Sequence, residues 1–162
     1  MTTSSQWNDF AVLVGGASGA LTGLLFVAVS LSRDPISHNA SLRASAGQTL
    51  ILLILPLPVC ALLVIPAQSK EALGAELLAL AVLVAVVLLV VSRRGRQPER
   101  SRLARLVDRR ETSLTVTVLL AAGAVIYWVG DGDGLYWLVP GILLSLITGV
   151  LNAWLFLVGD LA

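Results

Sequence analysis

The chain has 162 residues, of which 57% are apolar and 13% are charged, and its formal net charge at pH 7 is +1. Soluble domains contain roughly half apolar and a quarter charged residues, so this composition excludes an ordinary water-soluble domain. The charges are gathered into short segments between long apolar runs, a pattern typical of integral membrane proteins.

Five apolar runs are long enough to cross a bilayer as helices, since about 20 residues at a rise of ~1.5 Å span a hydrocarbon core of ~30 Å. The first run is too long for the apolar core of a signal peptide, so we expect no cleavage there. The expected fold is an all-α integral membrane protein, a compact bundle of about five transmembrane helices in a single domain, residues 1–162. The predicted spans cover residues 10–31, 48–67, 72–91, 113–129 and 136–158, and the fourth is the shortest.

Small residues recur at intervals of four in the first and fifth predicted helices. Helices in lipid pack most closely where small residues let their backbones approach. We therefore expect these glycines to form packing faces within the chain; self-association of subunits and a pore lining are the alternatives. The glycines are Gly15, Gly19, Gly23, Gly141 and Gly149.

Two prolines, Pro56 and Pro58, interrupt the second predicted helix near the middle of the membrane. Proline lacks the donor for the carbonyl one turn earlier, so the carbonyls of Leu52 and Ile54 lose their usual partners and the helix kinks. Such carbonyls can coordinate a cation or water, as in the discontinuous helices of transporters. The alternative is a static kink covered by neighbouring helices.

The predicted spans contain few polar side chains. Glu76 is the one carboxylate well inside a span, about one turn below the outer boundary, where it reaches water or pairs with Lys70, or has a functional role. Ser145, Thr148 and Asn152 follow spacings of three and four and so share one face of the fifth helix. This face predicts either hydrogen bonds between helices or the lining of a polar pathway.

A basic loop, residues 92–112, separates the third and fourth predicted helices; its eight arginines and three carboxylates leave a net charge of +5. Basic segments next to a membrane attract anionic headgroups by ~1 kcal/mol per residue. Pro98 is expected to start a short interfacial helix that runs to about Glu111. No aromatic residue interleaves the arginines, so nucleic acid is not an expected partner. The residues expected at the headgroups of anionic lipids are Arg93, Arg94, Arg96, Arg100, Arg102 and Arg105.

Lysine and arginine also predict the orientation, because cytoplasmic loops retain them. Ten of these residues fall on the side of the basic loop, whereas the other side has only Lys70. The predicted topology therefore has the N-terminus outside and the C-terminus inside. Aromatic residues that prefer the headgroup boundary agree, since five fall at the predicted outer boundary. These are Trp7, Tyr127, Trp128, Tyr136 and Trp137.

No enzyme, metal or cofactor signature is present in the sequence. General acid–base catalysis needs positioned titratable groups, and the spans contain essentially Glu76 alone. Cys60 is the single cysteine and His38 the single histidine, which leaves neither a disulfide framework nor a cysteine metal site. We expect a protein that is not an enzyme and has no cofactor.

Two functions remain for a small polytopic protein of this kind. We expect a channel or transporter subunit for ions or small solutes that works as an oligomer, because the bundle alone encloses little space. Its candidate polar lining is Glu76, Ser145, Thr148 and Asn152, and its candidate gate is the break at Pro56 and Pro58. The alternative is a non-catalytic regulatory or assembly subunit of a larger membrane complex. The expected partners are the lipid bilayer, further copies of the chain or another membrane protein. Arginine outnumbers lysine ten to one, which suits a high-GC bacterial genome and predicts the plasma (inner) membrane of a bacterium.

Overall fold

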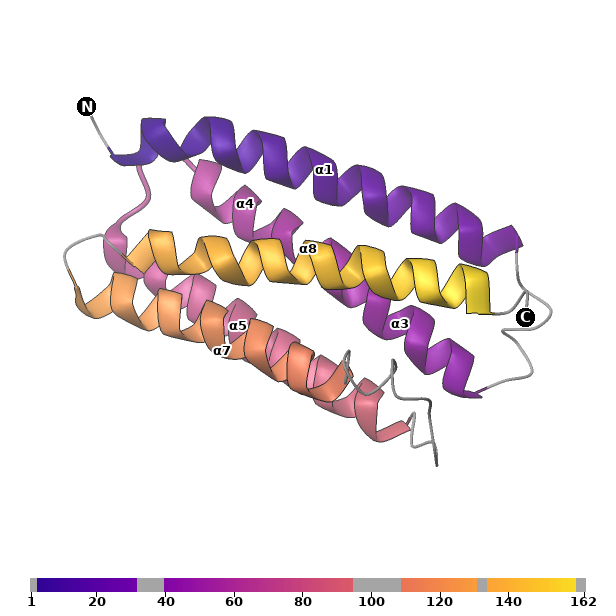
Figure 1. Cartoon of the computed structure of the whole chain (residues 1–162). Helices are drawn as coiled ribbons and strands as arrows, with labels where there is room; N and C mark the ends of the chain where they lie inside the picture. The colour runs from indigo at the N-terminus through magenta and orange to yellow at the C-terminus, as the bar shows by residue number, and fades with distance from the viewer. Residues whose placement is uncertain (1–2, 32–39, 95–108, 131–133, 160–162) are drawn as a thin grey trace.

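The computed structural model describes residues 3–31, 40–94, 109–130 and 134–159. Every regular element in these residues is an α-helix, and together they form a bundle (Figure 1). The all-α fold predicted from the sequence is confirmed for this part of the chain. The helices are α1 (Thr3–Leu31), α3 (Ala40–Ile54), α4 (Pro56–Val64), α5 (Lys70–Arg94), α7 (Arg109–Val129) and α8 (Gly134–Gly159).

Four stretches of the described residues are long and apolar enough to cross a membrane. The predicted fourth span falls in α7, whose apolar stretch, Leu114–Val129, is shorter. The reason is that α7 begins with the polar sequence RRETS before its apolar part. These lengths and compositions fit a membrane-embedded protein. The four stretches are Trp7–Leu31, Ala46–Val64, Lys70–Val91 and Gly134–Leu155.

The second predicted span, residues 48–67, differs from the structure at both ends. The helix already begins at Ala40, and it ends at Val64. Ile65 has extended backbone (φ −61°, ψ 120°), as expected for a residue that precedes a proline. Ala67 follows with a left-handed φ of 55°, so the helical path cannot continue to the predicted end.

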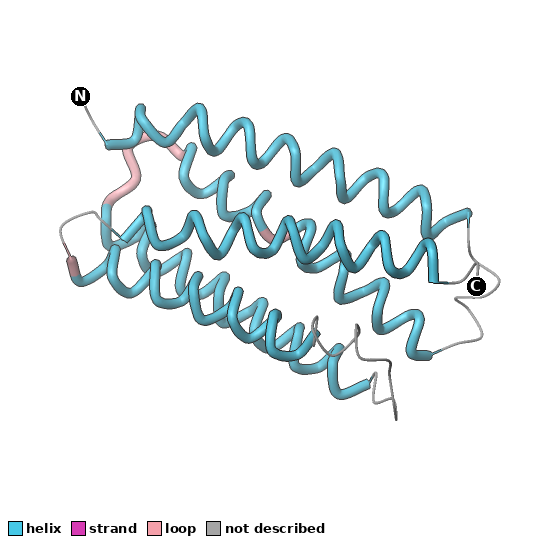
Figure 2. The backbone as a smooth tube through the Cα atoms, in the orientation of Figure 1, coloured by secondary structure: helices cyan, strands magenta, loops and turns pink. Residues whose placement is uncertain are grey.

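The predicted interruption by proline is present, as a short break at Leu55 between α3 and α4 (Figure 2). Leu55 keeps helical angles (φ −55°, ψ −43°), and its N–H donates to the carbonyl of Ile51 over 3.0 Å. The two segments therefore form one span that is interrupted at Leu55, called here the kinked span. Pro56 stands at the start of α4, where the missing N–H interrupts the helical hydrogen bonds.

α3, α4 and α8 lie in the middle of the bundle, with α1 on one side and α5 and α7 on the other (Figure 1). α7 packs along α5 and α8, and α3 packs along α8 and α5. α1 packs mainly along α4 and along α3, and touches α8 little. α1 therefore lies at one side of the bundle, and much of its surface faces away from the rest of the chain.

The two ends of the bundle differ in composition. One end, called here the turn end, holds the start of α1 and the connection between α4 and α5 (Figure 1). The opposite end, called here the basic end, holds the last residues of α5, Arg93 and Arg94, and the first residues of α7, Arg109 and Arg110. The connection between the first two predicted helices was expected on the same side as the basic loop, and this agrees with the structure because α1 ends and α3 begins at the basic end (Figure 1). Residues 95–108, which hold most of the predicted interfacial helix, lie outside the described residues, and residues 109–111 belong to α7.

Aromatic residues gather at the turn end. The rings of Trp7 in α1 and Tyr136 in α8 meet edge to face, with 5.0 Å between their centroids. Trp128, Tyr136 and Trp137 are exposed on the outside of the bundle, as expected for side chains at a membrane–water boundary. Trp154, near the opposite end of α8, is exposed as well.

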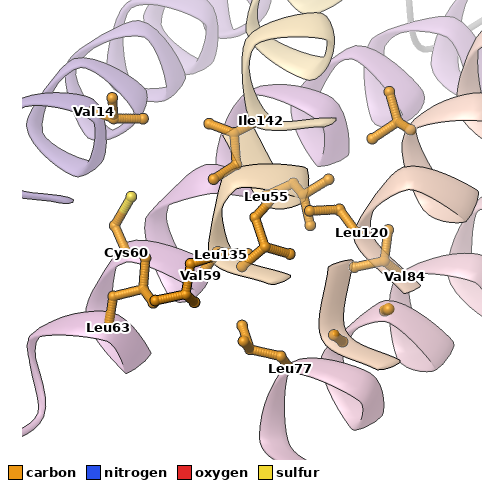
Figure 3. Packing of buried hydrophobic residues seen from close by; sticks show 14 of the residues in the cluster. Val14, Leu55, Val59, Cys60, Leu63, Leu77, Val84, Leu120, Leu135 and Ile142 are labelled. Carbon is orange, nitrogen blue, oxygen red and sulfur yellow. The ribbon is translucent and has the colours of Figure 1, made fainter. Parts of the chain in front are cut away.

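The core is apolar and continuous from α1 to α7. Figure 3 shows part of it, with Val14 of α1, Leu55 at the kink, Ile142 of α8 and Leu120 of α7. The sulfur of Cys60 points toward α1 in this view. In lipid this burial adds little hydrophobic driving force, so close packing and internal hydrogen bonds matter more for the stability of the bundle.

Candidate functional site

The kinked span is in close contact with two neighbouring helices at Leu53, three residues before Pro56. From α1, the hydroxyl of Ser18 donates to the carbonyl of Leu53 over 2.5 Å, and both residues are buried. From α8, Gly149 lies so close that a Cβ there would be 2.6 Å from Cδ2 of Leu53 and 3.5 Å from its backbone nitrogen. A small residue on each neighbouring helix therefore permits close contact at the centre of the bundle.

Pro56 is buried and Pro58 is half-buried, so the kink is covered by other parts of the chain. The sequence left open whether backbone carbonyls at the break face a pathway. The one carbonyl there with a partner from another helix is that of Leu53, among the described residues, and Ser18 occupies it. Ser18 lies between Gly15 and Gly19 on the packing side of α1 but was not among the predicted site residues.

Two of the three predicted glycines of α1 face α4. A Cβ at Gly15 would lie 3.2 Å from Cβ of Cys60, and one at Gly19 would lie 3.4 Å from Cδ1 of Leu57. Gly23 differs: it is exposed, and an added Cβ would meet nothing within 4 Å. The prediction that Gly23 packs within the chain is therefore wrong, because α3 diverges from α1 toward the basic end (Figure 1).

The other close contacts made by glycines join α5, α7 and α8. A Cβ at Gly141 would lie 3.3 Å from Cβ of Leu119 in α7. Two further glycines, which were not among the predicted packing residues, also pack tightly. Gly74 faces Trp128, and Gly123 faces Leu138, at 3.0 Å and 2.7 Å from an added Cβ. An interval of four marked Gly141 and Gly149, whereas these two glycines stand alone in their helices.

Three helices place polar side chains at one level of the bundle. Ser18, Leu53 and Gly149 mark a common height, since Leu53 is in close contact with each of the other two. One helical turn from there toward the basic end lie Thr22 in α1, Thr49 in α3 and Asn152 in α8, because α3 runs antiparallel to the other two. We call these three residues the polar layer.

The polar layer is buried but not fully hydrogen-bonded. Asn152 is 1% exposed, and neither its side-chain oxygen nor its side-chain nitrogen has a hydrogen-bond partner. The hydroxyl oxygen of Thr22 is likewise buried without a partner. Thr49 is buried and does have a partner. Buried polar groups are normally satisfied, so the unpaired atoms of Asn152 and Thr22 require an explanation.

Ser145 and Thr148 share the face of α8 that carries Asn152, as the spacing predicted. Both are buried. The hydroxyl of Ser145 donates to the carbonyl of Ile142 in its own helix over 2.9 Å, a local bond that satisfies it without another helix. Of the three predicted residues on this face, Asn152 is the one whose side-chain polar atoms are completely buried and without a hydrogen-bond partner.

The half of the bundle toward the turn end is apolar inside. Each fully buried polar residue of the described parts lies at mid-height or in the basic half. At the turn end itself, the side-chain oxygen of Gln68 is also buried without a partner. The interior between is apolar, so no continuous polar path crosses the described residues in this conformation. The basic half holds Gln48, Thr49, Thr148 and Asn152, and Ser18 and Ser145 lie at mid-height. The apolar half is closed by Ala11, Val59, Leu63, Leu73, Leu77, Leu135 and Leu138.

Glu76 is separate from this group. It is exposed on α5, and its carboxylate accepts a hydrogen bond from Nε2 of Gln68 over 2.5 Å. The alternative pairing with Lys70 is wrong, because the ammonium group of Lys70 donates to the carbonyl of Gly130, at the end of α7. A cation is favourable there, since the last turn of a helix presents unpaired carbonyls.

The predicted headgroup arginines are only partly within the described residues. Arg93 and Arg94 end α5 at the basic end. Arg96, Arg100, Arg102 and Arg105 lie outside the described residues. Their binding to anionic lipid therefore stays a prediction from charge and position.

No family model matches the chain, and the comparisons with curated proteins and with solved structures return no similar protein. Within the described residues no three His, Cys, Asp or Glu side chains gather closely enough to hold a metal ion. The polar layer is the main candidate site, because it contains buried polar atoms without hydrogen-bond partners.

Proposed function

We propose that the chain is a membrane-embedded transport protein, a channel or transporter subunit for ions or small solutes that works as an oligomer. The observation that supports this proposal most is the polar layer. A buried polar group without a partner costs about 1–3 kcal/mol, and unpaired polar groups inside membrane helices are typical of substrate pathways. A purely structural role for Asn152 would pair its amide with a neighbouring helix.

The proposed arrangement in the membrane follows from the charges. The basic end faces the cytoplasm of a bacterium, with the arginines at anionic headgroups. α7 crosses the membrane as a fifth span, since it packs along α5 and α8. The polar layer then lies toward the cytoplasmic side, and the apolar half closes the path to the outside.

In this proposal, the kinked span is the part that moves. α4 covers the apolar half against α1, and α3 carries Thr49 in the basic half. A change of the angle at Leu55 moves one half relative to the other, because the helical hydrogen bonds are already interrupted at Pro56. Opening between α4 and α1 would connect the polar layer to the turn end.

The test is flux through purified protein in liposomes, measured for monovalent ions, protons, halides and small neutral solutes. The variants are Pro56→Ala, which restores a helical donor at the kink, and Asn152→Leu, which removes the polar amide. Asn8→Leu is the matched control, because Asn8 is exposed at the turn end. We expect flux in the wild type and in Asn8→Leu and a changed rate in the other two. Folded protein that passes none of these species would refute the proposal.

A second candidate function is a regulatory or assembly subunit. One observation favours it: the outer face of α1 is apolar and open, with Leu13 72% exposed and no contact within 4 Å at Gly16 or Gly23. Small residues on such a face allow another membrane helix to approach closely. A stoichiometric partner that copurifies in mild detergent, and is lost in Gly16→Leu, would support this function.

A further inference from the structure

The chemistry of the polar layer also indicates which class of solute it takes, an inference that rests on the proposed transport function. The unpaired groups are one carboxamide, which both donates and accepts, and one hydroxyl, which does the same. A ligand that satisfies all of them must offer acceptors and donors together. Small amides and polyols do so, and water is the smallest molecule of this class.

Ions fit the layer less well. Cation sites inside membrane proteins use carboxylates or several backbone carbonyls. The carbonyls that the prolines leave without a helical partner are those of Leu52 and Ile54, and they point along α3 toward its C-terminal end, away from the layer at Thr49. The carbonyl of Leu53 is occupied by the hydroxyl of Ser18. The carboxylates of Asp9, Glu71 and Glu76 lie elsewhere, at exposed positions of α1 and α5. An anion would use the donors of the layer but leave the carbonyl oxygen of Asn152 unpaired.

We infer that the polar layer of Thr22, Thr49 and Asn152 is a binding site for a small uncharged hydrogen-bonding solute, held chiefly by the carboxamide of Asn152. The three residues come from α1, α3 and α8, so the site depends on the packing at Ser18, Leu53 and Gly149. The site is closed in this conformation, since Thr49 and Asn152 are each 1% exposed. A solute therefore enters by a movement of the helices around it.

The test uses acetamide and glycerol as neutral probes and potassium, protons and chloride as charged ones, in liposomes that contain the full chain. We expect the wild type to pass the neutral probes and exclude the ions. Asn152→Leu should reduce acetamide permeability about tenfold, the effect of losing one buried hydrogen bond. Thr22→Val, which keeps the shape of the side chain, should give a smaller reduction. Asn8→Leu should match the wild type.

The outcomes separate this inference from the proposed function. Ion flux that Asn152→Leu diminishes, without passage of acetamide or glycerol, would overturn the neutral class and leave the transport function standing. If no solute passes, thermal unfolding of the protein in detergent tests whether the polar layer binds acetamide. A rise in Tm with acetamide in the wild type that is absent in Asn152→Leu supports the site although the transport function fails. No rise in the wild type overturns the site as well.

Discussion

The hydroxyl of Ser18 in α1 donates to the backbone carbonyl of Leu53 in α3 over 2.5 Å, and both residues are buried. This bond joins the outermost helix of the bundle to the kinked span within a turn of Pro56. It also marks a boundary, because the polar layer begins one turn toward the basic end. The apolar half lies on the other side, where α1 packs on α4.

Ser18→Ala should weaken the contact between α1 and α3, because it removes the hydrogen bond to Leu53. We expect a loss of about 1 kcal/mol in the free energy of unfolding, since buried hydrogen bonds between membrane helices contribute about that much. Reversible unfolding in mixed micelles measures it. Ser30→Ala is the matched control, because Ser30 donates to Phe26 of its own helix at an exposed position. Equal effects of the two substitutions would show that the bond to Leu53 adds no stability.

Gly149 and Gly23 provide a second matched pair. Gly149→Ala places a Cβ 2.6 Å from a side-chain carbon of Leu53, so we expect a loss of about 1–3 kcal/mol from overpacking. Gly23→Ala meets nothing within 4 Å, and alanine is the better helix former by about 1 kcal/mol. It should therefore leave stability unchanged or raise it. The same micelle unfolding measures both, and a destabilised Gly23→Ala would indicate that its face is packed in the membrane.

Much of the architecture was predictable because lipid leaves few options for the backbone. Apolar runs of membrane length have to be helices, and the structure has helices over four of the five predicted runs and over most of the second. The kink at Pro56 was predictable from the missing N–H. The end of α4 at Val64 was not predicted, although Pro66 carried the signal, because a proline also occurs inside many membrane helices.

The candidate site was predictable in part. Spacing placed Ser145, Thr148 and Asn152 on one face, and the structure buries all three. Spacing cannot say which helix lies opposite, so Thr22, Ser18 and Thr49 were missed, and Glu76 was grouped with residues from which it is separate. Gly15 and Gly23 looked equivalent in sequence, and the divergence of α3 from α1 is what distinguishes them.

Asn152→Leu should stabilise the protein when no solute is added. The wild-type carboxamide is buried with both polar atoms unpaired, and an apolar side chain of similar size removes the cost of burying them. We expect a gain of about 1 kcal/mol. Unfolding in micelles shows whether the substitution raises or lowers the free energy of unfolding. A clear loss of stability would mean that the amide already has a strong partner in the membrane, outside the described residues or in another copy of the chain.

The orientation is testable with cysteine labelling, because the native Cys60 is buried at 2% exposure and the wild type should not react. Asp131→Cys places a thiol in the connection between α7 and α8, and Ser101→Cys places one in the basic loop. With the basic end inside, a membrane-impermeant maleimide added to intact cells should label the first variant only. Ser101→Cys should react after the membrane is opened. The reverse pattern would invert the topology and put the polar layer toward the outside. Labelling of both in intact cells would mean that α7 does not cross.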